Sequence, residues 1–354
     1  MNQSYVLIQK NDLLIYQVME KYGYFPKTSF YNNKNQNTNN QTIAEYQNFQ
    51  ILFPNFTNFF KNLDINFSHF IIRRRRIRRI RRTRRRNRNG EKKLKLNNEI
   101  KSFILNNIDS FDSEIKSFIG DSWTSLYKNV KSHIIIFLYL VNVYITDKLN
   151  NYDKNIMYWA ILFHDTGKFQ EMNKYYKEDY SINKRKDKSH PFKSAIIFIQ
   201  TLLNKNLIFF QDKKEKEDFI KFFQNEFTNA IYKSFVKENN NNYNFPLFYN
   251  ISFKNFYDIK KFLLNLKIHK QNKWVYDILI LIIFHQSLPN NDSGKYVNSP
   301  LLDNKYIKKF FNVRLLELMR IILIYDSSSY CLFDGNWAPK IDLLFDRLIN
   351  ELYK

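Results

Sequence analysis

The chain has 354 residues, enough for one large domain with an appendage or for two domains. Glycine and proline number only 6 and 7 while aromatic residues make up 18%, so a composition this poor in turn signals argues against a hairpin-rich fold and favours an all-α protein. The single cysteine, Cys331, excludes an internal disulfide framework and a cysteine-rich zinc site, and much of the formal charge of +23 lies in one short tract.

The N-terminal part is expected to form a helical extension over residues 1–72. Apolar residues recur at helical spacing in residues 1–30, which predicts one helix. Residues 32–41 are polar and low in complexity, which is typical of a loop. The aromatic-rich stretch 44–70 predicts one or two short helices.

The stretch Arg73–Arg88 contains twelve arginines in sixteen positions. Like charges at every turn repel, so an isolated helix here is marginal unless anions neutralise it. Two interpretations stay open: a segment that binds nucleic acid or another polyanion, or a solvated linker produced by an expanded arginine-codon repeat. In both, residues 73–97 form the boundary before a domain that spans residues 98–354.

An apolar run, residues 156–163, leads directly into His164 and Asp165. It predicts a helix over Lys154–Asp165 with a buried end, and Gly167 follows where a helix C-terminus tolerates left-handed backbone. An imidazole and a carboxylate buried there are costly unless a cation or hydrogen-bonding partners satisfy them. A polar pair that satisfies itself and a metal site are both compatible with these two residues alone.

The same construction recurs later in the chain. His190 lies at a predicted helix N-terminus, the apolar helix Val275–Phe284 ends on His285, and the apolar helix Phe310–Tyr325 leads into Asp326. Taken singly, such residues are ordinary polar groups at helix ends. Their recurrence is harder to explain by packing.

Three further histidines need interpretation. His133 lies within a helix predicted inside Ser122–Ile145, where a histidine alone is more often a packed core residue than a ligand. His69 and His269 have no partner at ligand spacing, and we expect His269 to be exposed.

In chain order, these residues resemble the signature of the HD superfamily of metal-dependent phosphohydrolases. That signature is a His, a His-Asp pair, one or more further His and an Asp, all on helices of one all-α domain. The matching residues are His133, His164, Asp165, His190, His285 and Asp326, with Gly167 and Lys168 after the His-Asp pair. The likeness spans roughly Leu126 to Tyr330.

The resemblance implies a multi-helix HD-type domain that holds one or two divalent ions, Mn, Fe, Mg, Ni or Co. It assigns His133, His164, Asp165 and Asp326 to a first metal, and it lets Asp165 bridge to a second metal held by His190 and His285. It further implies hydrolysis of a nucleotide or oligonucleotide phosphate ester by a metal-activated water. Lys168 is the nearby cation for a phosphate oxygen, with a solvated surface lysine as the alternative.

The Gly-Lys ending is similar to the branch of the superfamily that contains cyclic-dinucleotide phosphodiesterases and HD-type ribonucleases. The chain lacks the acidic pair of the alarmone hydrolases and the histidine typical of the deoxynucleotide triphosphohydrolases. Two alternatives stay open. One is a single-strand nuclease, favoured by positive charge and abundant aromatic residues; the other is an inert HD-fold protein that binds RNA or an assembly partner through Arg73–Arg88.

No basic region followed by a long apolar segment opens the chain, which argues against a secretory signal. The longest apolar segments, Ile134–Ile145 and Ile278–Phe284, are shorter than the roughly 20 residues that a membrane-spanning helix needs. We therefore expect a soluble, intracellular protein without a transmembrane segment, located in the cytoplasm, with an organelle or the nucleus as the alternatives.

Overall fold

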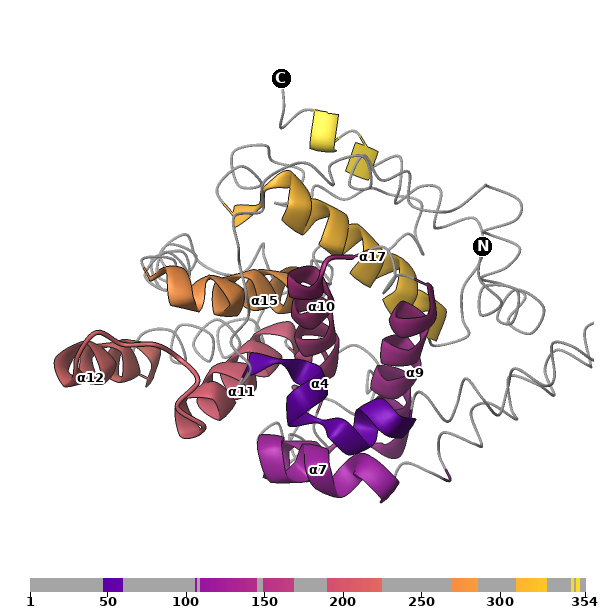
Figure 1. The fold of residues 1–354 in the computed structure, drawn as a ribbon, viewed down its shortest axis with the longest axis horizontal. Coiled ribbons are helices and arrows are strands. Elements are labelled where there is room, and N and C mark those ends of the chain that lie inside the picture. Colours follow the sequence, from indigo (N-terminus) through magenta and orange to yellow (C-terminus); the bar gives the residue numbers. More distant parts are fainter. Residues whose placement is uncertain are drawn as a thin grey trace, which may run out of the picture. The chain divides into compact units, whose positions relative to one another are not determined.

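The computed structural model describes residues 47–59, 106, 109–144, 149–168, 190–224, 269–285, 310–329, 345–346 and 348–350. Helices dominate these residues and none of them lies in a β-strand, which confirms the all-α prediction for this part of the chain (Figure 1). None of the helices it describes is long and apolar enough to cross a membrane. The helix predicted within residues 1–30 and the arginine tract Arg73–Arg88 lie outside the described residues.

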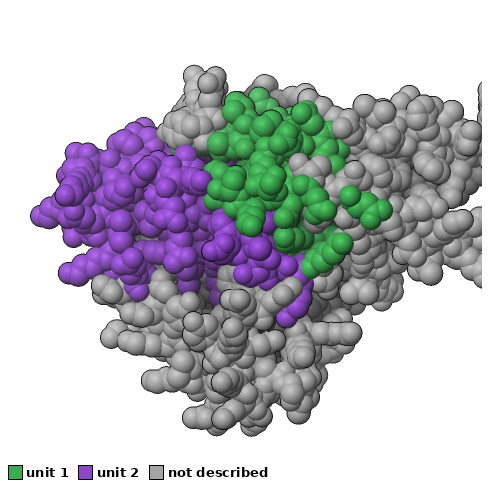
Figure 2. All heavy atoms as spheres, turned by 90° about the horizontal axis from the view of Figure 1, so that it is seen from below, with its two compact units in different colours: residues 1–118, 128–158, 320–347 green, residues 119–127, 159–319, 348–354 purple. Residues whose placement is uncertain are grey.

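The chain divides into two compact units, coloured green and purple in Figure 2. Unit 1 comprises residues 1–118, 128–158 and 320–347, and unit 2 comprises residues 119–127, 159–319 and 348–354.

Unit 1 contains two complete helices, all but the last residue of a third, and parts of two others. They are α4 (Phe49–Leu52), α7 (Asp109–Ile119), α9 (Lys128–Tyr144), the first part of α10 (Asn151–Phe163) and the last part of α17 (Val313–Ser329). The helix that was predicted to carry His133 is α9.

The described part of the N-terminal region packs on α7 through aromatic rings. Phe59 and Phe56 contact Phe111 with ring centroids 4.8 and 5.0 Å apart, and all three side chains are buried. The carboxylate of Glu114, also on α7, accepts hydrogen bonds from the backbone N–H groups of Asn55 and Phe56. Residues 47–59 are therefore part of the core of unit 1.

Two polar contacts hold α9 in place within unit 1. The Lys131 ammonium group lies 3.0 Å from the Asp112 carboxylate on α7, and the Tyr158 hydroxyl on α10 donates to the Asn142 side chain at 2.8 Å. Because α9 is anchored on two sides, the direction in which it presents His133 is defined.

Unit 2 contains the later part of α10, the first part of α17 and five further elements. These are α8 (Asp121–Thr124), α11 (His190–Asn204), α12 (Lys213–Phe222), the 3₁₀ turn η6 (Lys270–Asn272) and α15 (Lys273–Phe284).

A cluster of four aromatic side chains joins α10, α11 and α15 in unit 2. Trp159 lies 5.9 Å from Trp274 between ring centroids, and Phe163 and Phe198 approach to 5.0 Å edge to face. All four are buried, and aromatic pairs at such separations stabilise a core beyond their area alone. The cluster therefore packs the three helices that carry or precede these candidate ligands against one another.

The helix α15 is buried on every side from Trp274 to Phe284. Its one acidic residue, Asp277, is paired with Arg314 at 2.8 Å, so this charge is compensated inside the core. The Tyr276 hydroxyl donates to the backbone carbonyl of Phe310 at 3.0 Å. A helix held on all sides in this way leaves little freedom to His285, the residue that follows it.

Candidate metal centre

The turn after α10 carries the His-Asp pair. The structure ends α10 at Phe163 and places His164 to Gly167 in a tight turn, in which the Thr166 hydroxyl and N–H both donate to the Phe163 carbonyl oxygen. His164 and Asp165 are each 1% exposed. The predicted buried end of an apolar helix is thus confirmed. The two polar residues, His164 and Asp165, directly follow the last residue of the helix.

The expected left-handed backbone at Gly167 is wrong, because among the described glycines only Gly120 has a positive φ. The glycine is needed there for another reason. A Cβ on Gly167 would lie 2.7 Å from Lys193 Cβ and 2.8 Å from Ser194 N, and closer still to the carbonyl oxygen of His190. Real Cβ atoms do not approach so closely, so only glycine allows the turn to pack against α11.

The other two ligand candidates of unit 2 stand where the sequence predicted them. His190 is the first residue of α11, and His285 is the cap residue that directly follows α15. Both are 1% exposed, and α11 and α15 pack against each other. The His190 Nε2 and His285 Nε2 atoms are 3.1 Å apart.

Asp165 lies at the middle of this group. Its Oδ1 is 2.9 Å from His190 Nε2 and 3.7 Å from His285 Nε2, and its Oδ2 is 3.5 Å from His164 Nε2. Lys168 Nζ reaches Oδ2 at 2.6 Å. One ligand atom from each of His164, Asp165 and His285 fits within 4.8 Å of the others, a spacing suited to one shared cation.

The hydrogen bonds of two of these rings determine which nitrogen faces Asp165. Nδ1 of His164 lies 2.7 Å from the Ile161 carbonyl oxygen, and Nδ1 of His285 lies 2.6 Å from the Ile282 carbonyl oxygen. A carbonyl oxygen only accepts, so Nδ1 carries the hydrogen in both rings and Nε2 of the neutral ring offers a lone pair. Histidines that bind metals are oriented in the same way by an acceptor on the other nitrogen.

The Nε2 lone pair of His285 can accept a hydrogen bond from a His190 Nε2–H group 3.1 Å away, whereas a lone pair that faces the Asp165 carboxylate is repelled by it unless a cation lies between them. A buried proton or a buried metal ion could fill this role, and a set of three imidazoles around one carboxylate suits a divalent transition metal. The donor chemistry of unit 2 therefore fits the ion that the sequence predicted.

His190 stays neutral at physiological pH. Its pKa is lowered from 6.5 to about 4, mainly because burial disfavours the imidazolium; the charge of Lys168 lowers this pKa further, and Asp165 offsets only part of the shift. A neutral ring is the form that binds a metal without first releasing a proton.

We expect the stability of the chelated protein to fall as the pH drops from about 6.5 to about 4. In this window the unfolded chain takes up a proton at His190 and the folded chain does not, so the free energy of unfolding declines by about 3 kcal/mol for this group. Urea unfolding at a series of pH values, in EDTA, measures the effect. The His190→Gln variant should lack this part of the pH dependence, and parallel profiles for variant and wild type would contradict the shift.

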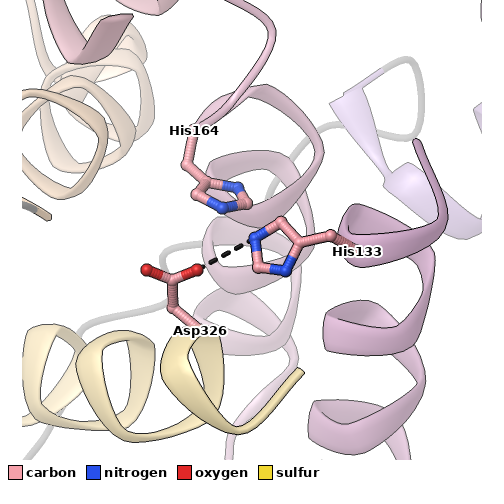
Figure 3. A group of neighbouring side chains, drawn as sticks. All are labelled: His133, His164 and Asp326. Carbon is pink, nitrogen blue, oxygen red and sulfur yellow. Dashed lines mark ion pairs between the residues drawn. The ribbon is translucent and has the colours of Figure 1, made fainter. Parts of the chain in front are cut away.

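Unit 1 holds the remaining two ligand candidates as a pair. His133 Nε2 on α9 lies 2.9 Å from Asp326 Oδ1 on α17, and the two side chains are 1% and 17% exposed (Figure 3). Figure 3 also labels His164, which belongs to unit 2. The structure corrects the position of Asp326, which lies inside α17 and not at its end, because α17 continues to Ser329.

Ser329 orients the ring of His133. Its hydroxyl donates to the Asp326 carbonyl oxygen at 2.6 Å, so toward His133 Nδ1 the same oxygen acts as the acceptor. His133 Nδ1 therefore carries a hydrogen, and Nε2 is the nitrogen that faces the Asp326 carboxylate. Nε2 of His164 and of His285 faces a carboxylate in unit 2 as well.

The structure thus brings together four predicted ligands in unit 2 and two in unit 1. That all six ligand candidates share one centre stays a prediction, because the six residues belong to two different units. Sequence reasoning did not assign roles to Ser194 and Ser329, since an isolated serine in a helix carries no signal of its own.

The expected exposed position of His269 is wrong. Its side chain is 18% exposed, and its Nε2 pairs with Glu215 Oε1 on α12. His269 also contacts the ring of Phe209 edge to face. His269 therefore contributes to the contact between α12 and the start of η6. It is not among the ligand candidates of unit 1 or unit 2. His69 lies outside the described residues.

Comparisons of the chain with protein-family models, with curated proteins and with solved structures gave no match.

Proposed function

We propose that this protein is a metal-dependent phosphohydrolase of the HD type that cleaves a phosphodiester or phosphomonoester of a nucleotide. One observation carries the proposal: three imidazoles and one carboxylate meet in a buried part of unit 2, and two of the imidazoles hydrogen-bond a backbone carbonyl through Nδ1, which leaves Nε2 on the side of that carboxylate. The resemblance of the ordered ligand set to the HD signature supplies the reaction class.

Four residues would hold a divalent ion in unit 2: His164, Asp165, His190 and His285. The assignment of His133 and Asp326 to a first ion, together with His164 and Asp165, comes from the sequence pattern. A bound divalent ion would lower the pKa of a water molecule and compensate negative charge on phosphate oxygens. Mn, Fe, Ni and Co suit this imidazole-rich set better than Mg, which prefers oxygen ligands.

The protein's own residues supply charge and position around such an ion. The Asp165 carboxylate is the negative charge that a buried cation needs, and it also holds Lys168 Nζ at 2.6 Å. The Lys168 side chain is 24% exposed, whereas the ligand side chains of unit 2 are at most 1% exposed. Lys168 is therefore placed where this cluster meets solvent, and its ammonium group can donate to a phosphate oxygen.

The proposal is tested with the full chain purified without chelator. Metal content is measured by mass spectrometry, and the protein is then stripped and reloaded with Mn, Fe, Co, Ni or Mg. Hydrolysis is followed on bis(p-nitrophenyl) phosphate, p-nitrophenyl phosphate and a single-stranded oligonucleotide. We expect turnover that disappears in chelator and returns with a transition-metal ion.

Two histidine variants provide a matched pair. His285→Gln removes a proposed ligand, whereas His269→Gln removes a histidine that is engaged with Glu215. We expect the first to lose metal and activity and the second to keep both. A chain that binds no divalent ion would overturn the proposal. A chain that binds a divalent ion and hydrolyses none of the three substrates would restrict the proposal to metal binding. Cleavage of the oligonucleotide alone would favour the nuclease alternative.

A further inference from the structure

The ligand turn and α11 are joined by the hydroxyl group of one buried residue, Ser194. Its Oγ accepts a hydrogen bond from the Gly167 N–H at 2.8 Å and donates one to the His164 carbonyl oxygen at 2.8 Å. Ser194 is 0% exposed. A single side-chain atom therefore engages the backbone at both ends of the turn that carries His164 and Asp165.

The geometry of the turn makes this contact specific. The N–H groups of Thr166 and Lys168 bond within the turn itself, to Phe163 and Asp165. The Gly167 N–H instead bonds across to Ser194, and the absence of a Cβ on Gly167 gives α11 room to approach. Only a hydroxyl side chain of this size can accept one backbone hydrogen bond and donate another from the same atom.

Ser194 also shares a helix face with a ligand candidate. It follows His190 by four residues in α11, and residues four apart lie on the same side of a helix. The serine contact thus fixes the distance between the His-Asp turn and the helix start from which His190 Nε2 reaches Asp165 Oδ1 at 2.9 Å.

We infer that Ser194 is a positioning residue for the metal centre: its hydroxyl group holds the turn of His164 and Asp165 against the start of α11, so that the ligands from both elements converge. The inference deepens the proposed function, and it rests on that function for the claim that the positioned residues bind a metal. The contact between Ser194 and the turn can be tested without a metal.

The test compares variants of the full chain that differ in one hydroxyl group. Ser194→Thr and Ser194→Val have nearly the same shape, and only threonine can replace both hydrogen bonds. Ser194→Ala removes the hydroxyl without adding volume. The matched control on the same helix is Thr201→Ala, because the Thr201 hydroxyl is buried too but donates to Ile197 within α11.

Two quantities are measured: the affinity for Co²⁺, by competition with a chelator, and the hydrogen-exchange rate of the Gly167 amide in metal-free protein. We expect Ser194→Ala and Ser194→Val to lower the Co²⁺ affinity by about 10- to 100-fold, the range seen when outer partners of metal ligands are lost. Exchange at Gly167 should accelerate in both. Ser194→Thr should bind Co²⁺ more tightly than Ser194→Val, and Thr201→Ala should match wild type in both measurements.

Equal Co²⁺ affinity in the threonine and valine variants, with unchanged exchange at Gly167, would overturn the inference. If Ser194→Ala does not fold, the threonine and valine pair still decides. If wild type binds no Co²⁺, the proposed metal centre fails; the exchange rate of Gly167 then shows separately whether Ser194 holds the turn.

Discussion

Replacing Asp165 with asparagine is expected to remove most of the bound metal and to abolish hydrolysis. Among the described residues, the Asp165 carboxylate is the anionic group that the three imidazoles of unit 2 surround, and asparagine keeps its shape while removing its charge. A buried cation left without its counter-charge is strongly destabilised. We expect the metal affinity to fall by at least about 100-fold, the upper end of what the loss of an outer partner costs.

Lys168→Met is the matched comparison, because Lys168 contacts Asp165 but offers no lone pair to a metal while it is charged. Its removal should leave the metal content unchanged and weaken turnover through substrate affinity or rate. Metal analysis and hydrolysis of bis(p-nitrophenyl) phosphate distinguish the two variants. An Asp165→Asn protein with full metal occupancy and full activity would show that the chemistry lies elsewhere.

The second large effect is expected from Gly167→Ala. A methyl group at this position would overlap the first turn of α11, so the ligand turn and α11 must separate. Such overpacking lowers the free energy of unfolding by about 1–3 kcal/mol. Because the separation also moves Asp165 away from His190, we expect the metal affinity to fall by at least about tenfold.

Gly120→Ala controls for the loss of stability alone. Gly120 has φ 83° and ψ −152°, a conformation essentially restricted to glycine, but nothing lies within 4 Å of the added Cβ. Alanine there should cost about 1–3 kcal/mol through backbone strain. Thermal unfolding and Co²⁺ titration of both variants separate the two effects. Equal metal affinity in the two alanine variants would mean that the close approach at Gly167 does not position the ligands.

Local patterns were sufficient to predict the helices that carry or precede the ligand candidates in the described part of the chain. Apolar runs before His164 and before His285 predict buried helices because a helix can bury all its faces only if all are apolar, as α15 does from Trp274 to Phe284. The start of α11 at His190 followed from its proline-containing first turn. The apolar runs and the proline lie within one or two helical turns of the helix ends that they predict.

The tertiary structure alone decided the contacts between segments that are distant in sequence. The role of Gly167 is set by the backbone of α11, and Ser194 reaches it across 27 positions. Ser329 and His133 are 196 positions apart, so neither sequence neighbourhood indicates that the serine sets the tautomer of the ring. Periodicity defines which face of a helix is buried, but the depth and rotation at which two helices dock depend on the side chains of both. Only the docked helices could therefore show which hydroxyl and backbone groups hold the ligands in place.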